Sequence, residues 1–180
     1  LGPVYGKQWR DFNGVDQLKD LVYSINTNPD SRRLMVSAWA PHELDEMALP
    51  PCHYAFQVYI NNGVMDLMWQ QRSADVFLGL PYDITMYGLL LEMLAQGAGL
   101  KAGQLIGQLG DCHLYNNHLE QAKEYRDRSK RAMPQLELKA GISIIDFDNT
   151  SELFIPNKNN IKLNNYNPYA AIKAELSVGK

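Results

Sequence analysis

A cysteine that follows two prolines is the residue best suited to nucleophilic chemistry in this chain. Cys52 comes directly after Pro50–Pro51 and before an apolar run. Because each proline fixes one backbone dihedral, the approach to Cys52 is stiff and holds the thiol at a defined place. A thiol becomes a nucleophile when cations stabilise its thiolate, and Arg72 and the Arg32–Arg33 pair are the candidates. A buried structural cysteine is the alternative, since free cysteine is among the most buried residue types.

Arginine side chains flank two of the apolar runs. Arg32–Arg33 stand before one run, and Gln71–Arg72–Ser73 close another. Guanidinium forks together with a hydroxyl group match the oxygens of a phosphate. These residues therefore indicate a phosphate-binding site, and surface salt bridges are the alternative for each arginine.

A histidine and a tyrosine lie two positions apart in the segment Asp111–Tyr115. In an extended segment the side chains of His113 and Tyr115 project to the same side. Such a pair suits hydrogen bonding to ligand hydroxyl groups. The alternative is the start of a capped helix with a satisfied histidine.

Composition and spacing exclude several classes of protein. The 180 residues are 46% hydrophobic and 21% charged, which indicates one globular domain and argues against disorder, fibres and a disulfide scaffold. The net charge of −3 argues against a nucleic-acid coat but is compatible with a small anionic ligand. The sequence shows no zinc-type spacing, no phosphate loop and no dinucleotide-binding glycine motif. It also shows no membrane span and no signal peptide. With only two cysteines, a reducing cytosol is the favoured compartment.

Periodicity and turn residues predict an α+β fold, with a mixed or antiparallel sheet and helices packed on it. Asn61–Asn62–Gly63 predicts a hairpin turn, because Asn and Gly accept positive φ. Strands are expected over residues 34–39, 53–60, 64–71, 104–111, 136–139 and 161–163. A helical turn is expected over 42–48, and helices over 16–28, 82–96 and 117–130, the second buried on most sides and the third amphipathic. Residues 147–160 are polar and rich in turn formers.

Several ordered motifs together resemble those of the thymidylate synthase family. They read LGPVYGKQWR, DSRR with VSAW, MALPPCH, QRSADVFLGLP and GDCHLYNNH, and the likeness weakens after about Pro134 before recovering partly over 166–174. The resemblance implies a mixed sheet with packed helices, with sheet faces forming the interface of a homodimer. It also implies that residues 1–180 are a catalytic domain without the family's N-terminal third, so we expect a longer parent protein.

In that family a cysteine thiolate adds to C6 of a deoxypyrimidine monophosphate, and C5 then attacks the one-carbon unit of 5,10-methylenetetrahydrofolate. The resemblance implies such a transferase of nucleotide biosynthesis, with a folate co-substrate and no metal. It assigns catalysis to Cys52, His53 and Asp83, and substrate binding to Gln71 and Asp83. Arg72 and Ser73 match the phosphate cradle, and His113 and Tyr115 match the groups that bond the sugar hydroxyl. Folate binding is assigned to Asp75, Leu78 and Gly79. Arg32 and Arg33 match a pair that reaches into the neighbouring subunit's site, which implies a homodimer with shared sites.

One departure from the family's pattern bears on the base. Where the family has Phe-Asn, this chain has Tyr82–Asp83. The asparagine amide accepts from uracil N3–H and donates to O4, whereas cytosine offers a bare N3 and an N4 amine. A carboxylate accepts from that amine and shares a proton with N3, so Asp83 indicates dCMP, as in phage dCMP hydroxymethylases. The alternatives are a dUMP-to-dTMP synthase that tolerates the aspartate and a non-catalytic RNA-binding regulator, which the acidic balance disfavours.

The C-terminal residues bear on the product. In the family, hydride from tetrahydrofolate gives a methyl group and water gives a hydroxymethyl group, so exclusion of water decides the outcome. The family's tail closes over the ligands, and Ile172–Lys173–Ala174 fits it, but Glu175 replaces the usual proline and the chain runs on through Leu176–Lys180. We therefore expect the closed site to admit water and the product to be hydroxymethyl-dCMP. We expect the protein to act in the cytoplasm, and Asp83 suggests the cytoplasm of a phage-infected cell.

Overall fold

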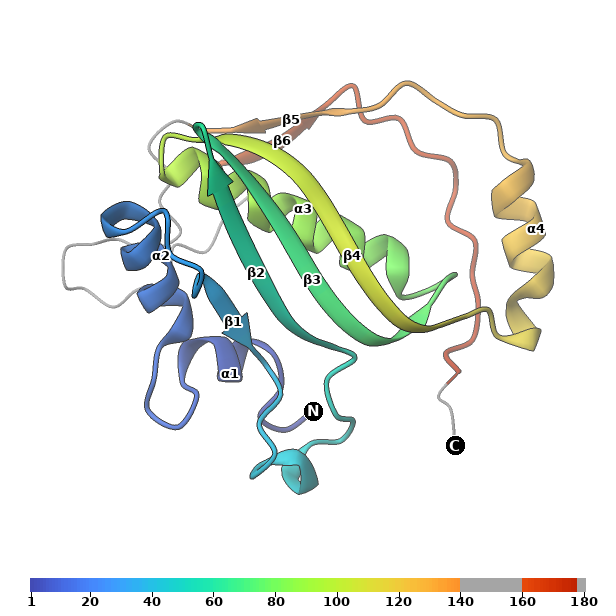
Figure 1. Cartoon of the computed structure of the whole chain (residues 1–180). Helices are drawn as coiled ribbons and strands as arrows, with labels where there is room; N and C mark the ends of the chain where they lie inside the picture. The colour runs from blue at the N-terminus through green and yellow to red at the C-terminus, as the bar shows by residue number, and fades with distance from the viewer. Residues whose placement is uncertain (140–159, 178–180) are drawn as a thin grey trace.

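A four-stranded mixed sheet crosses the middle of the molecule in the order β1-β2-β3-β4 (Figure 1). This computed structural model describes residues 1–139 and 160–177. The strands are β1 (Met35–Ser37), β2 (His53–Asn61), β3 (Val64–Asp75) and β4 (Lys101–His113). The pairs β1–β2 and β2–β3 are antiparallel, and β3–β4 is parallel. The expected α+β fold with a mixed sheet and packed helices is confirmed.

The tight turn between β2 and β3 is the predicted hairpin. Asn62 and Gly63 have φ values of 50° and 77°, which are the positive angles that a two-residue hairpin turn needs. The parallel pair β3–β4 needs a crossover instead, and helix α3 (Leu80–Gly97) supplies it. Because of this crossover, α3 lies along one face of the sheet, behind the strands in Figure 1.

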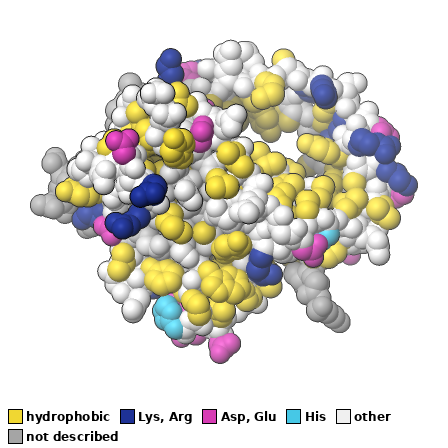
Figure 2. All heavy atoms as spheres, in the orientation of Figure 1, with side chains coloured by type: hydrophobic (Ala, Val, Ile, Leu, Met, Phe, Trp, Pro, Cys, Tyr) yellow, Lys and Arg dark blue, Asp and Glu magenta, His cyan; other side chains and the backbone are white. Residues whose placement is uncertain are grey.

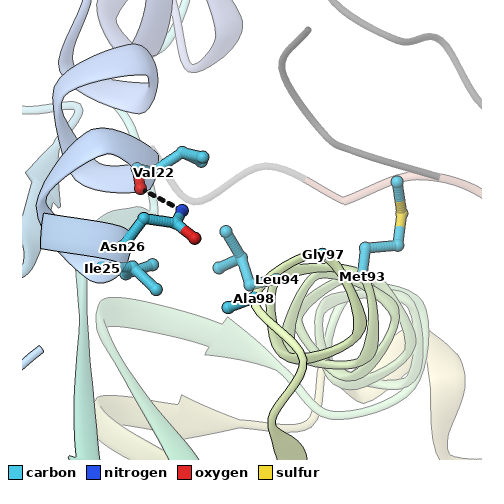
Figure 3. A pocket seen from close by; sticks show the side chains of 7 residues that line it. All are labelled: Val22, Ile25, Asn26, Met93, Leu94, Gly97 and Ala98. Carbon is cyan, nitrogen blue, oxygen red and sulfur yellow. Dashed lines mark hydrogen bonds between the residues drawn. The ribbon is translucent and has the colours of Figure 1, made fainter. Parts of the chain in front are cut away.

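The hydrophobic core lies between the sheet and two helices. Alternate residues of β2 and β3, such as Phe56 and Leu67, face Tyr87 and Leu91 of α3, and α2 (Gln17–Thr27) adds an apolar stripe. Where α2 meets the C-terminal end of α3, the remaining space is only about 10 Å³ (Figure 3). That volume is near the lower limit for one water molecule, so α2 and α3 are closely packed here and leave no room for a ligand.

The prediction that the helix over 82–96 is buried on most sides is wrong for its first half. Tyr82 is 76% exposed, Ile84 45% and Met86 37%. The C-terminal half is covered on two sides, by the sheet and by α2, whereas the described residues cover the first turns only on the sheet side. The exposed half therefore borders open space, and its N-terminus becomes one wall of the cleft described below.

The remaining elements are short. They are α1 (Gly6–Arg10), η1 (Leu44–Glu46), η2 (Asn116–His118), α4 (Leu119–Asp127), and the antiparallel pair β5 (Gln135–Leu138) and β6 (Ile161–Asn164). The helical turn after His42 and the two late strands are confirmed. The expected amphipathic helix is shorter than predicted, and α4 buries no side chain. Apart from Asn160, the polar stretch 147–160 lies outside the described residues.

No helix within residues 1–139 and 160–177 covers the other face of the sheet. Residues of alternate register, including Met35, Tyr59 and Ile106, are exposed there. Figure 2 shows hydrophobic side chains gathered over this face. Among the helices of residues 1–139 and 160–177, none is both long and apolar enough to cross a membrane.

Candidate active site

A cleft of about 730 Å³ opens where β3 and β4 end and α3 begins. This volume lies within the range of small-molecule sites. The cleft brings together every predicted site residue except the Arg32–Arg33 pair: Cys52, His53, Gln71, Arg72, Ser73, Asp75, Leu78, Gly79, Asp83, His113 and Tyr115. Residues scattered over more than sixty positions of sequence thus face one space, as the motifs predict.

The parallel pairing explains why these residues meet. Since β3 and β4 run in the same direction, their carboxyl ends share one edge, with Ser73 opposite Asp111 and Asp75 opposite His113. Asp75 also shapes the turn into α3, because its Oδ1 accepts from the backbone N–H groups of Phe77 (3.0 Å) and Leu78 (3.2 Å). The strand ends and the helix start are therefore fixed relative to each other.

The loop that carries Cys52 is held by hydrogen bonds on both sides. The Cys52 N–H donates to the Tyr5 hydroxyl at 3.0 Å, and its carbonyl accepts from the Arg72 N–H at 2.8 Å. The Arg72 guanidinium donates to the carbonyls of Pro51 (3.0 Å) and Pro50 (2.9 Å). The thiol is free and partly exposed. Arg72 therefore positions the cysteine loop and is also the cation beside Cys52 in the cleft.

A chain of polar contacts links Trp69 to Asp83 across the bottom of the cleft. The Gln71 Oε1 accepts from the indole N–H of Trp69 at 3.0 Å, which fixes the orientation of the Gln71 amide. The Gln71 Nε2 then donates to Asp83 Oδ2 at 2.8 Å and to the Ser73 carbonyl at 2.9 Å. One oxygen of Asp83 is thus occupied, and Oδ1 lies 3.9 Å from Nε2 of His53.

Burial controls the titration of the aromatic groups around His53. Desolvation lowers the pKa of His53, and the nearby Asp83 carboxylate opposes that shift. Burial raises the pKa of both Tyr5 and Tyr87 above the ordinary value for a phenol. His53 is therefore neutral at neutral pH, and both tyrosines keep their protons.

The Arg32–Arg33 pair lies elsewhere. Both side chains are exposed just before β1, and they do not line the cleft of their own chain. β1 and β4 are the opposite edges of the sheet, and the cleft opens near β4. Cys52 directly precedes the start of β2, whereas the β1–β2 register, with Met35 opposite Gln57, places Arg33 level with the far end of that strand. Within one chain, the Arg32–Arg33 pair therefore lies away from the Cys52 thiol.

Tyr5 lines the cleft as well, although the sequence motifs assigned it no role. Its ring stacks on His53 with 4.1 Å between centroids and 12° between planes, and its hydroxyl bonds Cys52. The backbone at Tyr5 has φ 38° and ψ −94°, which is strained for a residue with a Cβ. The available signal was its place inside the first motif, five residues from the start of the sequence.

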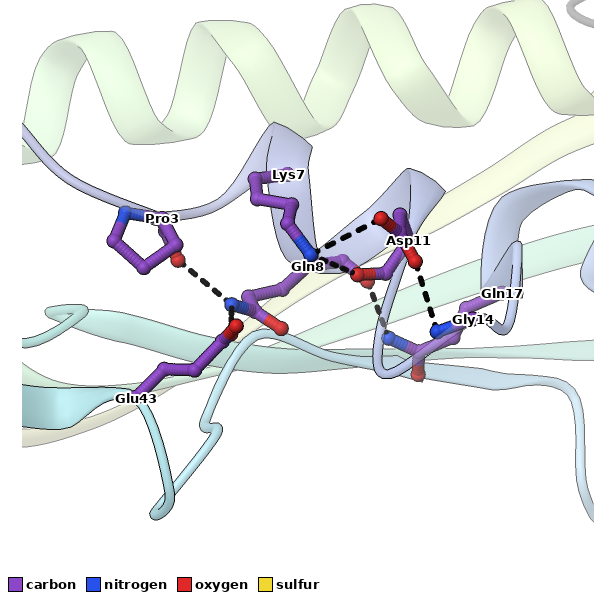
Figure 4. Close-up of polar contacts among 7 residues, drawn as sticks. All are labelled: Pro3, Lys7, Gln8, Asp11, Gly14, Gln17 and Glu43. Carbon is purple, nitrogen blue, oxygen red and sulfur yellow. Dashed lines mark hydrogen bonds and ion pairs between the residues drawn. The ribbon is translucent and has the colours of Figure 1, made fainter. Parts of the chain in front are cut away.

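A buried glutamine anchors the segment that presents Tyr5. Gln8 is fully buried, and its Nε2 donates to the Pro3 carbonyl at 2.7 Å and to the Glu43 carboxylate (Figure 4). Gln17 donates to the Gln8 carbonyl at 2.8 Å, which ties α1 to α2. These contacts hold the first turn of the chain against the rest of the fold, so the Tyr5 ring has a fixed base.

The last described residues close one side of the cleft. Leu176 and Ser177 line it, and the segment before them runs between the sheet and α4 (Figure 1). The fully buried His118 is bonded through Nε2 to the Glu175 carbonyl at 2.7 Å, and the Ser177 hydroxyl donates to Asn117 at 2.9 Å. Side chains next to the cleft therefore hold this segment by its backbone.

Within residues 1–139 and 160–177, no three His, Cys, Asp or Glu side chains gather as a metal site. The residues of the cleft are instead a thiol, a guanidinium, hydroxyls, imidazoles and carboxylates. Such a set suits covalent catalysis on an anionic ligand that carries hydroxyl groups.

Comparison with known proteins agrees with this chemistry. Residues 1–178 match the family model described as Thymidylate synthase. The chain is 46% identical over 178 residues to "Thymidylate synthase" of Mycoplasma pneumoniae, and the match covers 99% of this chain and 59% of the relative. It is 49% identical over 183 residues to "Thymidylate synthase" of Coxiella burnetii strain Dugway, and this match covers 99% of this chain and 66% of the relative. It is 47% identical over 179 residues to "Probable thymidylate synthase" of Escherichia phage T5 (98% and 62%). The chain thus spans 59% to 66% of the length of these relatives. The chain belongs to the thymidylate synthase family.

Proposed function

We propose that this protein transfers a one-carbon unit to C5 of a deoxypyrimidine monophosphate through a covalent adduct on Cys52. The observation that carries the proposal is the shared cleft: the thiol, the Arg72 guanidinium and the Asp83 carboxylate all line it. Membership of the family supports the same reaction class. A free, partly exposed thiol beside a guanidinium is the arrangement that nucleophilic catalysis needs.

Each step is assigned to residues of the cleft. Arg72 and Ser73 bind the phosphate, and His113 and Tyr115 bind the sugar hydroxyl. The Cys52 thiolate forms a bond to C6, and the ring electrons move to C5, which then bonds the one-carbon carrier's carbon. The C5 proton leaves, the carbon's bond to the folate nitrogen breaks with tetrahydrofolate as the leaving group, and a methylene group remains at C5. Water then adds its oxygen to that methylene with loss of one proton, and the electrons return through C5 to expel the Cys52 thiolate from C6. The covalent route is needed because C5 of an unactivated pyrimidine is a poor nucleophile.

The same cleft fits the folate that the family implies. Asp75 uses Oδ1 to hold the turn, so Oδ2 remains as an acceptor for ring N–H groups. A Cβ on Gly79 would lie 3.3 Å from the Asp75 carbonyl oxygen, so a larger residue there would press on the turn that Asp75 shapes. Leu78 adds an apolar contact. When bound, 5,10-methylenetetrahydrofolate would supply the one-carbon unit, and these residues would orient it.

For the nucleotide base we propose cytosine. Because Gln71 donates to Oδ2 of Asp83, the other oxygen, Oδ1, is the atom left for the base. An oxygen there accepts from the N4 amine of cytosine but opposes O4 of uracil. The unpaired contact costs about 1–3 kcal/mol, or roughly ten- to a hundredfold in preference for dCMP. The three relatives compared, all named as thymidylate synthases, favour the second candidate, conversion of dUMP to dTMP.

The product is proposed to be the 5-hydroxymethyl nucleotide. This choice depends on how tightly residues 165–177 exclude water from the cleft. Glu175 and Leu176 are exposed, and the described contact that holds Glu175 is the bond between its backbone carbonyl and His118. A segment held in this way admits water more readily than one packed by apolar side chains.

A product-mass assay tests these proposals together. The whole protein is incubated with 5,10-methylenetetrahydrofolate and either dCMP or dUMP, and the products are separated by mass. Hydroxymethyl-dCMP supports all three proposals. Preference for dUMP removes the argument from Asp83, a methylated product removes the argument from the C-terminal segment, and no product from either nucleotide removes the reaction itself.

We further propose that the protein acts as a homodimer in a reducing cytosol. The open face of the sheet carries the exposed side chains Met35, Tyr59 and Ile106, which a second copy would cover. In a dimer, Arg32 and Arg33 would reach the partner's cleft. If so, mixing inactive Cys52→Ala subunits with inactive Arg33→Ala subunits should restore activity in hybrid dimers. Sedimentation as a monomer, or no recovery on mixing, contradicts shared sites.

A further inference from the structure

A buried tyrosine outside the cleft lining lies against the histidine next to Cys52. Tyr87 is only 1% exposed, and its ring stacks on Trp69 with 5.4 Å between centroids and 14° between planes. Its hydroxyl lies 2.8 Å from Nδ1 of His53. Because the core fixes the phenol ring, the hydroxyl stands at a fixed place and can act as a template for the imidazole.

Counting donors and acceptors decides which group carries the proton. If His53 carried its proton on Nδ1, the Tyr87 hydroxyl would accept it and would itself lack an acceptor in the part of the chain that the structure describes. The bare Nε2 would then face Oδ1 of Asp83 at 3.9 Å, which places two acceptors together. If Tyr87 donates to Nδ1, the hydroxyl is paired and the Nε2–H points at the carboxylate. The second arrangement pairs the Tyr87 hydroxyl and puts a donor, not a bare acceptor, on the side of the carboxylate. The 3.9 Å separation from Oδ1 is longer than a hydrogen bond but favourable in charge, so this arrangement is favoured.

The surroundings of His53 make the tautomer consequential. Burial lowers the pKa of the imidazole, so the neutral ring, which has two tautomers, is the form present at neutral pH. Tyr5 covers one face of the ring at 4.1 Å, and Tyr87 meets it edge-on at 5.4 Å. A ring held on these sides cannot turn over about its Cβ–Cγ bond, which would put a ring carbon where each nitrogen stands, without disturbing both neighbours.

We propose that Tyr87 is a positioning residue that holds His53 in the tautomer with its proton on Nε2, so that an N–H donor faces Asp83. The consequence for substrate choice rests on the proposed function. A donor on this side complements the negative charge of Asp83, whereas a bare nitrogen there would oppose it, so the tautomer bears on the oxygen that the cytosine amine would meet. Tyr87 thereby acts on base selection without touching the nucleotide.

Nitrogen NMR of the unliganded protein tests the tautomer directly. In ¹⁵N-labelled protein, with the His53 signals identified by their loss in His53→Gln, Nδ1 should resonate as an unprotonated nitrogen and Nε2 as a protonated one. In Tyr87→Phe the two signals should shift toward each other as the tautomers mix, whereas Asp83→Asn should keep the wild-type pattern. Tyr23→Phe, which removes an exposed hydroxyl from α2, is the matched control and should change nothing.

Two results would overturn the assignment. The first is a protonated Nδ1 of His53 in the wild-type protein. The second is a wild-type pattern of ¹⁵N signals in folded Tyr87→Phe together with mixed tautomers in Asp83→Asn, because Asp83 would then set the tautomer. If Tyr87→Phe does not fold, the wild-type and Asp83→Asn spectra still decide the point.

Kinetics test the consequence for specificity. In Tyr87→Phe the ratio of kcat/KM for dCMP to that for dUMP should fall by about tenfold, with an unchanged KM for the folate. Mixed tautomers with an unchanged ratio would overturn the role in base selection. A protein that turns over neither nucleotide would remove the proposed function, yet the NMR result would stand on its own.

Discussion

The bottom of the cleft and its C-terminal edge are built in different ways. The cleft floor, defined as Cys52, His53, Gln71, Arg72 and Asp83, is carried by strand ends, a rigid loop and a helix. Its side chains are held by hydrogen bonds to one another and to the backbone, such as the bond from the buried Gln71 to the half-buried Asp83. Such a structure maintains the fixed geometry that bond making and breaking require.

The C-terminal edge, defined as residues 165–177, contains no helix or strand. It is attached through side chains that reach its backbone: His118 to Glu175, Arg128 to Ala170, and Arg131 to Asn167 and Pro168. Tyr169 lies under both arginines, with 3.7 Å from Arg131 to the ring centroid. Few contacts hold this edge, so it can open at low cost, and changes there should alter binding and product more than the chemical step.

The largest expected effect comes from the nucleophile on the floor. Cys52→Ala removes the sulfur that bonds C6, so release of tritium from C5-labelled nucleotide should fall by at least about a thousandfold. Cys112→Ala removes the other free thiol, which is exposed on β4, and should release tritium at close to the wild-type rate. Wild-type release from Cys52→Ala would show that the floor does not act by covalent catalysis.

The next effect is on the base. Asp83→Asn still offers an oxygen to Gln71 but places an amide N–H₂ where Oδ1 stood, so preference should move from dCMP toward dUMP by roughly ten- to a hundredfold. The ratio of kcat/KM values for the two nucleotides measures the change. Asp20→Asn, an exposed position on α2, is the control. An unchanged ratio would mean that residue 83 does not read the base.

A smaller effect is expected where the edge meets the fold. His118→Phe keeps a ring but loses the donor to the Glu175 carbonyl, so the segment should open more often and the KM for the folate should rise by about fivefold to tenfold. Hydrogen exchange of residues 175–177 should speed up, and the hydroxymethyl share of the product should grow. His118→Gln retains a donor and should recover part of the loss. Equal exchange in all three proteins would contradict this attachment.

The smallest effect is expected at the far end of the same edge. Arg131→Gln removes the contacts with Asn167 and the Tyr169 ring, but the site is exposed, so the change should be less than about 1 kcal/mol, or under roughly fivefold in KM. Arg126→Gln breaks only a pair with Asp127 on α4 and serves as the control. A loss at Arg131 as large as that at His118 would show that the edge moves as one unit.

Local signals in the sequence predict most of the floor. Asn61–Asn62–Gly63 gives the hairpin because its conformational demand is local, and the motif around Cys52 places the thiol before a strand. The parallel pairing of β3 with β4 is not a local property, yet it is what brings Asp75 beside His113. The family resemblance supplied that long-range information.

Properties that depend on neighbours escaped prediction. The exposure of Tyr82 follows from what covers α3 and not from its own apolar pattern. Tyr5 joins the site only because the buried Gln8 anchors the first turn, a contact between side chain and backbone that spacing does not reveal. The Arg32–Arg33 pair is the reverse case, because the family resemblance gives it a role that one chain does not display. That role depends on a second subunit.

The backbone at Tyr5 shows that the fold gives up stability to place an aromatic ring. A left-handed φ of 38° at a residue with a Cβ costs on the order of 1–3 kcal/mol, which glycine would recover. Glycine would also delete the hydroxyl that receives the Cys52 N–H and the ring that covers His53. Variants selected only for heat resistance should therefore accumulate changes at position 5 and lose the proposed activity, so a thermostabilised version of this protein must be screened for both properties at once.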